Sequence, residues 1–151
     1  MPSVRGCYLP DELLYDVDNH IWFQEQGDGN VKIGMTSVAT AMAGKLVAFT
    51  PKKVGRSVSA GKSCATLESG KWVGPAKSAA GGEIVMVNED LANDPTIANS
   101  DPYEKGWLVI LKPENWDDVK GSLTRGTDVT APYEAKMDSE GFGGCGCEPG
   151  E

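Results

Sequence analysis

The 151-residue chain has a single histidine, few cations and no long apolar run. One histidine, His20, argues against metal sites that need several histidines and against a serine–histidine–aspartate triad. Fourteen lysines and arginines stand against 22 aspartates and glutamates, for a formal net charge of −8. Because binding to phosphate backbones needs clustered cations, this balance argues against nucleic acid as a partner. The acidity predicts a soluble protein whose partners offer basic docking surfaces.

Apolar runs and cysteines are also scarce. No stretch approaches the roughly 20 apolar residues of a membrane span, and residues 1–17 lack the apolar core of a signal peptide. We therefore expect a cytoplasmic protein that does not enter a membrane. The four cysteines are too few and too unevenly placed for a secreted disulfide scaffold. They are Cys7, Cys64, Cys145 and Cys147. Cys64 lies within an apolar run and is expected to be a small buried residue.

Glycine and proline are abundant, with 19 and nine residues respectively, and they separate short apolar runs. About six or seven such runs at near-regular spacing predict a mainly β protein, a sandwich or flattened barrel of antiparallel strands. Strands are expected at residues 20–25, 31–35, 45–50, 64–67, 83–87 and 106–112. Short helices are expected at residues 36–44 and 114–123, where a capping residue precedes helix-forming positions.

The stretch at residues 63–77 is the centre of the sequence. We expect the strands at 64–67 and 83–87 to be joined through Ser69, Gly70 and Lys71, so that the turn carries one exposed amine. A lysine in a turn is usually only a solvated charge. The alternative is that Lys71 is a site of covalent attachment, and this alternative needs support from the rest of the chain.

That support is a resemblance to the H protein of the glycine cleavage system, a lipoyl carrier. The segments that carry it, in chain order, are residues 20–22 (HIW), 29–36 (GNVKIGMT), 54–55 (VG), 60–61 (AG), 67–71 (LESGK), 82–89 (GEIVMVNE), 99–103 (NSDPY) and 106–109 (GWLV). Each segment is weak alone, but their ordered combination over residues 18–125 is specific. The resemblance implies a barrel-sandwich hybrid fold, that is, a flattened β-barrel of two antiparallel sheets with short helices.

The resemblance also implies a cofactor and a division of the chain. The family's modified lysine falls on Lys71, so we expect lipoic acid there as a covalent lipoyl group. Residues 1–17 are expected to form an N-terminal arm, residues 18–125 the lipoyl-binding domain, and residues 126–151 a flexible tail that contains glycine and cysteine and buries little. By this reading the protein is a carrier without catalytic activity of its own. Its partners would be lipoylating enzymes and the enzymes of its pathway.

The chain departs from the family pattern around the lysine, where Gly70 precedes Lys71 and Trp72 follows it. Together with the cysteine-bearing tail, this departure is similar to the H-protein-like lipoate-binding proteins of the sulfur-oxidising heterodisulfide-reductase-like system. That resemblance implies a carrier of sulfur intermediates, with the heterodisulfide-reductase-like complex as partner. Two alternatives remain open: a glycine cleavage carrier of an aminomethyl group, with the glycine cleavage enzymes as partners, and an unlipoylated interaction module.

Three finer points also follow from the sequence. Trp72 either offers the dithiolane an apolar resting place or only packs on the hairpin. Cys145 and Cys147 either exchange with lipoyl thiols or belong to a dispensable tail. Because a carrier presents one tip to several partners in turn, we expect a monomer.

Overall fold

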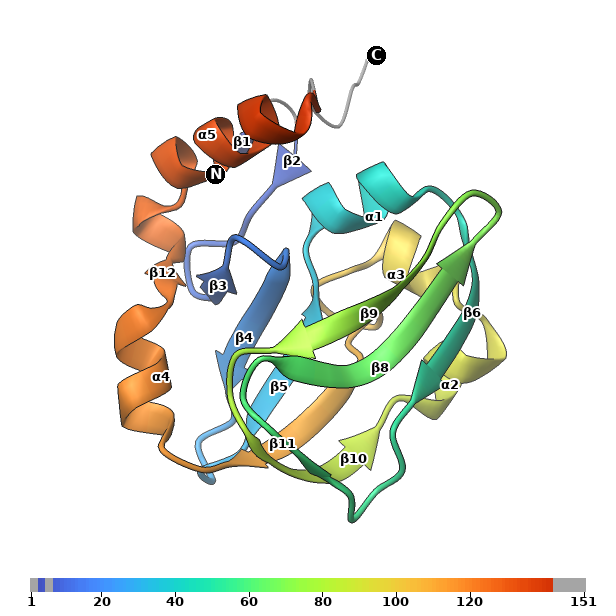
Figure 1. Cartoon of the computed structure of the whole chain (residues 1–151), viewed down its shortest axis with the longest axis vertical. Coiled ribbons are helices and arrows are strands. Elements are labelled where there is room, and N and C mark those ends of the chain that lie inside the picture. The colour runs from blue at the N-terminus through green and yellow to red at the C-terminus, as the bar shows by residue number, and fades with distance from the viewer. Residues whose placement is uncertain (1–2, 5–6, 143–151) are drawn as a thin grey trace.

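The computed structural model describes residues 3–4 and 7–142 (Figure 1). Its strands are β1 (Ser3–Val4), β2 (Cys7–Tyr8), β3 (Leu14–Asp16), β4 (Ile21–Glu25), β5 (Val31–Met35), β6 (Leu46–Pro51), β7 (Ser57–Val58), β8 (Lys62–Ser69), β9 (Val73–Ser78), β10 (Gly82–Val87), β11 (Val109–Pro113) and β12 (Thr124–Arg125). Its helices are α1 (Ser37–Ala43), α2 (Glu89–Asn93), α3 (Ile97–Ser100), α4 (Trp116–Ser122) and α5 (Thr130–Glu140), with a 3₁₀ turn η1 (Gly126–Asp128).

Two antiparallel sheets form the body of the molecule. The larger has seven strands in the order β12-β3-β4-β5-β11-β10-β7, and the smaller has three in the order β6-β8-β9. A short pair of β1 and β2 lies apart from both. The expected fold class, mainly β with two antiparallel sheets and short helices, is confirmed.

The local signals in the first half of the chain act as the sequence predicted. The β4–β5 hairpin closes with a 2.9 Å hydrogen bond from Gln26 N to Asn30 O. Helix α1 begins where Thr36 Oγ1 accepts from Ala39 N at 3.2 Å. It ends at Gly44, whose φ of +83° is a conformation that glycine adopts without a steric cost.

The main core fills the space between the two sheets. The side chains of strand β4 alternate between two cores. Ile21 and Phe23 lie in this main core, whereas Trp22 points to the opposite face. Successive side chains of a strand face opposite sides, so β4 is buried on both. The principal contributors from the other strands are Ile33, Leu46, Leu67, Ile84 and Leu111.

A second core lies on the far side of β4, between the N-terminal segment and helix α5 (Figure 1). It holds Trp22 together with Tyr133 and Met137 of α5, and all three side chains are 0 % exposed. The expectation that residues after 125 bury little is therefore wrong for the described residues 126–142. Residues 143–151, which include Cys145 and Cys147, lie outside the described part of the chain.

Among the described residues, no helix is both long enough and apolar enough to cross a membrane.

Candidate functional site

The candidate site begins at the hairpin formed by β8 and β9. The two strands pair from Lys62 opposite Ser78 to Glu68 opposite Val73. Ser69 N donates to Trp72 O at 2.7 Å, which closes a loop of only two residues, Gly70 and Lys71. Such a short loop is held in place by the strands on either side of it.

The partner strand of this hairpin differs from the expected one. Residues 83–87 belong to β10 of the larger sheet, and β9 pairs with β8 instead. Strand β9 was missed because it contains Gly74 and Pro75, which ordinarily weaken a strand. Proline is tolerated here because β9 is the edge strand of its sheet, where one row of backbone groups has no partner strand.

Lys71 is exposed at the tip of the hairpin, as expected. Its stem lies against the C-terminal end of α1, since a Cβ built on Gly44 would be 3.2 Å from Lys71 Cε. Within the described chain, no carboxylate lies within 4.0 Å of its Nζ. The amine of Lys71 is therefore accessible from solvent, and it forms no ion pair with any described residue.

Beside Lys71 lies a cleft of about 290 Å³ between α1, the start of β4, and β9. Trp72 forms one wall, with its indole so close over Gly74 that a Cβ there would be 2.3 Å from the ring. Trp72 thus packs on the hairpin and lines the cleft at once. The other apolar lining residues are Ile21, Met35, Ala39, Met42, Ala43, Pro75 and Ala76.

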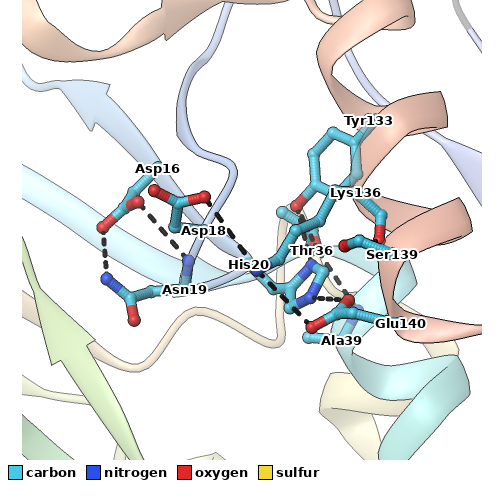
Figure 2. Close-up of polar contacts among 10 residues, drawn as sticks. All are labelled: Asp16, Asp18, Asn19, His20, Thr36, Ala39, Tyr133, Lys136, Ser139 and Glu140. Atoms are coloured by element: carbon cyan, nitrogen blue, oxygen red, sulfur yellow. Dashed lines mark hydrogen bonds and ion pairs between the residues drawn. The ribbon is translucent and has the colours of Figure 1, made fainter.

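The polar end of this cleft is formed by His20 and Glu140 (Figure 2). His20 Nε2 lies 2.8 Å from Glu140 Oε1, and Nδ1 lies 3.2 Å from the Tyr133 hydroxyl. That hydroxyl lies 3.2 Å from Thr36 Oγ1, the cap of α1. Because a carboxylate only accepts, Nε2 carries the proton of neutral His20 and Nδ1 accepts from Tyr133. The chain of contacts joins α5 to α1 across the cleft.

Burial lowers the pKa of His20 below its ordinary value, and this outweighs the opposing effect of Glu140. Lys136, whose Nζ is 3.6 Å from Glu140 Oε2, lowers it further. A protonated His20 would be a buried cation, so the folded protein keeps this ring neutral at a pH where the unfolded chain protonates it.

This lowered pKa predicts a loss of stability on mild acidification. Below about pH 6.5 the unfolded chain binds a proton at His20 that the folded protein does not, so the free energy of unfolding falls with pH until the folded pKa is reached. His20→Asn removes the titration, and asparagine tolerates the φ of +58° at this position. Denaturant unfolding between pH 7.5 and 5 should show a steeper fall for the wild type than for the variant. Equal slopes would contradict the prediction.

Comparison with known proteins decides the family. The family model described as "Glycine cleavage H-protein" matches residues 13–136. The chain belongs to the glycine cleavage H-protein family. It is 53 % identical over 127 residues to "Glycine cleavage system H protein 5" of Aquifex aeolicus, covering 82 % of this chain and 85 % of that protein. It is 41 % identical over 132 residues to "Probable glycine cleavage system H protein 2" of Sulfurisphaera tokodaii, covering 86 % and 89 %.

A solved structure agrees with the fold of this H-protein family member. The crystal structure of a glycine cleavage system H protein from Mycobacterium marinum superposes with a TM-score of 0.71 at 34 % identity, covering 88 % of this chain and 99 % of that one. The fold, two antiparallel sheets with a few short helices, is therefore that of the family.

Glycine cleavage H proteins carry a covalent lipoyl group on a lysine. The residues present fit such a group, because an exposed primary amine stands beside an apolar cleft that contains two thioether side chains, Met35 and Met42, and one indole. Sulfur of a dithiolane is attracted to such surfaces. Sequence reasoning found Lys71 and Trp72 but missed the methionines and Gly44, because residues so far from the hairpin in sequence give no local signal that they meet there.

Cys64, close to the hairpin in sequence, takes no part in this chemistry. Its side chain is 0 % exposed and its thiol donates to Ala76 O at 3.4 Å. Burial raises the pKa of this thiol to about 12, so it stays protonated and unreactive at neutral pH. The expectation of a small buried residue is confirmed.

Proposed function

We propose that this H-protein family member is a lipoyl carrier whose lipoyl group is attached to Lys71. The observation that carries the proposal is an exposed amine on a closed two-residue loop, directly beside an apolar cleft. When attached, the lipoyl group supplies a pair of thiols that exchange with disulfides and persulfides. The chain itself supplies a fixed point of attachment, a place where the arm rests, and surfaces that enzymes recognise.

For the cargo we propose sulfur intermediates, passed between enzymes of a cytoplasmic sulfur-oxidation pathway such as the heterodisulfide-reductase-like system. The electrostatics of the cleft support this choice. Glu140 is the one carboxylate among the described lining residues. It already accepts a hydrogen bond from neutral His20 at 2.8 Å and forms an ion pair with Lys136 at 3.6 Å. A cationic aminomethyl group would enter the cleft without a free anion to pair with, and an unpaired buried charge is costly.

The glycine cleavage carrier of an aminomethyl group remains the second candidate, because the relatives are named as glycine cleavage H proteins. Those names also show several numbered proteins in one organism, since Aquifex aeolicus has H proteins 2, 3 and 5. One carrier suffices for one pathway. Such numbering supports the proposal that some members serve a different one.

An experiment in two steps tests the site of lipoyl attachment and the identity of the cargo. Peptide mass spectrometry of protein from its native cells should find a lipoyl adduct on the peptide that contains Lys71. The lipoylated protein is then tested in the redox state that each reaction needs: the reduced dithiol form is offered a polysulfide, whose sulfane sulfur a thiolate attacks. The oxidised disulfide form is offered glycine with glycine decarboxylase, because the aminomethyl group adds to one sulfur while the disulfide bond breaks. Addition of sulfur atoms without an aminomethyl adduct supports the sulfur cargo, and the reverse result supports glycine cleavage. A bare Lys71 would leave only an interaction module.

Trp72→Ala tests whether the tryptophan holds the arm in the cleft. Aromatic rings attract sulfur by about 0.3–1.5 kcal/mol, so losing the indole should release the arm and speed alkylation of its thiols by about two- to tenfold. The measurement is the rate of reaction of the lipoylated, reduced protein with a small thiol reagent. Trp72→Phe, which keeps an aromatic ring, is the matched control. An unchanged rate in both variants would mean that Trp72 only packs on the hairpin.

A further inference from the structure

The net charge of the chain conceals a strong segregation of charge. Residues 45–77 hold seven of the 14 cations and only one of the 22 acids, Glu68, which gives this stretch a net charge of +6. The rest of the chain holds seven cations and 21 acids, for a net charge of −14. The stretch holds β6, β8 and nearly all of β9, together with the connection between β6 and β8 in which β7 joins the larger sheet. The part of the protein that carries Lys71 is therefore basic on an otherwise acidic chain.

All seven cations are exposed, and they lie on β8 and β9 or on the segments that flank and connect β6, β8 and β9. Lys45 precedes β6, whose first residue pairs with Ser69, so Lys45 lies beside the tip of the hairpin. Lys62 and Lys77 lie toward the other end of β8 and β9. The remaining cations of the stretch are Lys52, Lys53, Arg56 and Lys71. In the part of the chain that the structure covers, no carboxylate comes within 4.0 Å of any of the seven.

The outer face of the sheet between these cations is uncharged except for Glu68, which is exposed and pairs with Val73 near the tip. Val73 is 64 % exposed and Val47 56 % exposed, both near the tip. Thr66 pairs with Thr50 on one side and Pro75 on the other, and all three are exposed or half-buried. In Figure 1, β8 and β9 lie at the front of the molecule with no helix over them. We call this outer face, together with its seven cations, the basic face.

We propose that the basic face is the docking surface for an acidic surface on the enzyme that attaches the lipoyl group, an inference that rests on the function proposed above. In that reaction Lys71 Nζ attacks the carbonyl of an activated lipoyl ester or anhydride. The N–C bond forms, the activating group departs with its electron pair, and Nζ loses a proton. The enzyme must therefore bring its active site within bonding distance of a short stem, which places its surface against the sheet around the hairpin.

Charge complementarity selects the partner. A surface with exposed valines and seven cations that have no ion pair to a described carboxylate fits acidic groups around an apolar contact. Like-signed surfaces would repel it. Nucleic acid is disfavoured because the remaining −14 would face its phosphates nearby. Enzymes that react with the distal thiols can stand a whole arm's length away, so they have less need of this face.

Salt dependence and charge reversal test the proposal. The unmodified protein is used as substrate of its cognate lipoate-attaching enzyme, and kcat/KM is measured from about 25 mM to about 500 mM NaCl, a range over which surface charges become screened. The wild type should lose at least about fivefold in kcat/KM over this range. The double variant Lys45→Glu/Lys77→Glu should be at least about tenfold lower at low salt, mainly through KM, with a flattened or reversed salt dependence.

The matched control is Lys105→Glu/Arg125→Glu, which makes the same change in net charge at exposed positions outside the basic face. Its kcat/KM should stay within about twofold of wild type. Salt-independent modification of the wild type, or equal losses in both double variants, would overturn the docking surface while leaving the lipoyl carrier intact. A wild type that is never modified would overturn both. Sedimentation showing a salt-sensitive dimer lost in Lys45→Glu/Lys77→Glu would assign the face to a second copy instead.

Discussion

Replacing Lys71 with arginine should leave the protein folded and wholly without a lipoyl group. The guanidinium keeps the positive charge and the length of the side chain, but it stays protonated and does not act as an amine nucleophile. Since Lys71 is exposed and no ion pair to its amine is found in the described chain, the free energy of unfolding should change by less than about 0.5 kcal/mol. Intact mass after co-expression with lipoate-attaching enzymes is the measurement.

Lys45→Arg is the control for this variant. Lys45 is another exposed lysine beside the hairpin tip, close to where an attaching enzyme would reach. Its replacement should leave the adduct in place, because Lys45 precedes a strand and does not occupy the two-residue loop. An adduct that survives in Lys71→Arg and disappears in Lys45→Arg would show that the lipoyl group is attached to Lys45, which would contradict the proposal.

Tyr133→Ala should be the most destabilising of the substitutions considered, at about 3–5 kcal/mol. Tyr133 is 0 % exposed, and its ring makes an edge contact with Tyr15 at 6.5 Å between centroids. Truncation would open a cavity in the second core and break the contacts to His20 and Thr36 together. Denaturant unfolding followed by tryptophan fluorescence measures the loss, since Trp22 lies in the same core.

Tyr133→Phe separates packing from hydrogen bonding. It keeps the ring and removes only the hydroxyl, so it should cost about 1–3 kcal/mol, the range for buried polar groups left without a partner. If Tyr133→Ala were as mild as the phenylalanine variant, α5 would contribute little to the fold, and the second core would not stabilise the protein as its burial indicates.

The sequence anticipated those elements whose signals are local. The glycines between β4 and β5, Thr36 before α1 and Gly44 after it each fix the backbone within a few residues. The ordered motifs then identified the family, and they single out Lys71 as the expected site of attachment. All of this information is carried by residues close to one another in the chain.

The sequence did not predict the elements that depend on contacts between residues far apart in the chain. Strand β9 holds Gly74 and Pro75, and only its pairing with β8 at the sheet edge makes it a strand. Helix α5 has two large apolar residues, Tyr133 and Met137, and their burial depends on the N-terminal segment more than 100 residues earlier. Such a short apolar stripe is not distinguishable in sequence from a solvated helix or a loop.

The separation of positive from negative residues is present in the sequence, but the net charge of the whole chain hides it. A net charge of −8 predicted basic surfaces on partners, whereas the residues around Lys71 carry the opposite sign. Total charge describes the field far from a protein, while a docking enzyme meets the local field within about 10 Å. Only the pairing of β6, β8 and β9 places those cations around a single face.

The two-residue loop has a consequence for how enzymes would be arranged around this carrier. Because Ser69 N donates a hydrogen bond to Trp72 O at 2.7 Å, the backbone of Lys71 is a fixed pivot for the arm. Movement of the loop therefore adds nothing to the reach of the arm. Every active site that the cargo visits would then lie on or inside one sphere centred on that pivot, with a radius equal to the extended arm. In each complex with a successive enzyme, the distance from the Lys71 backbone to the active site would therefore not exceed the length of the extended arm.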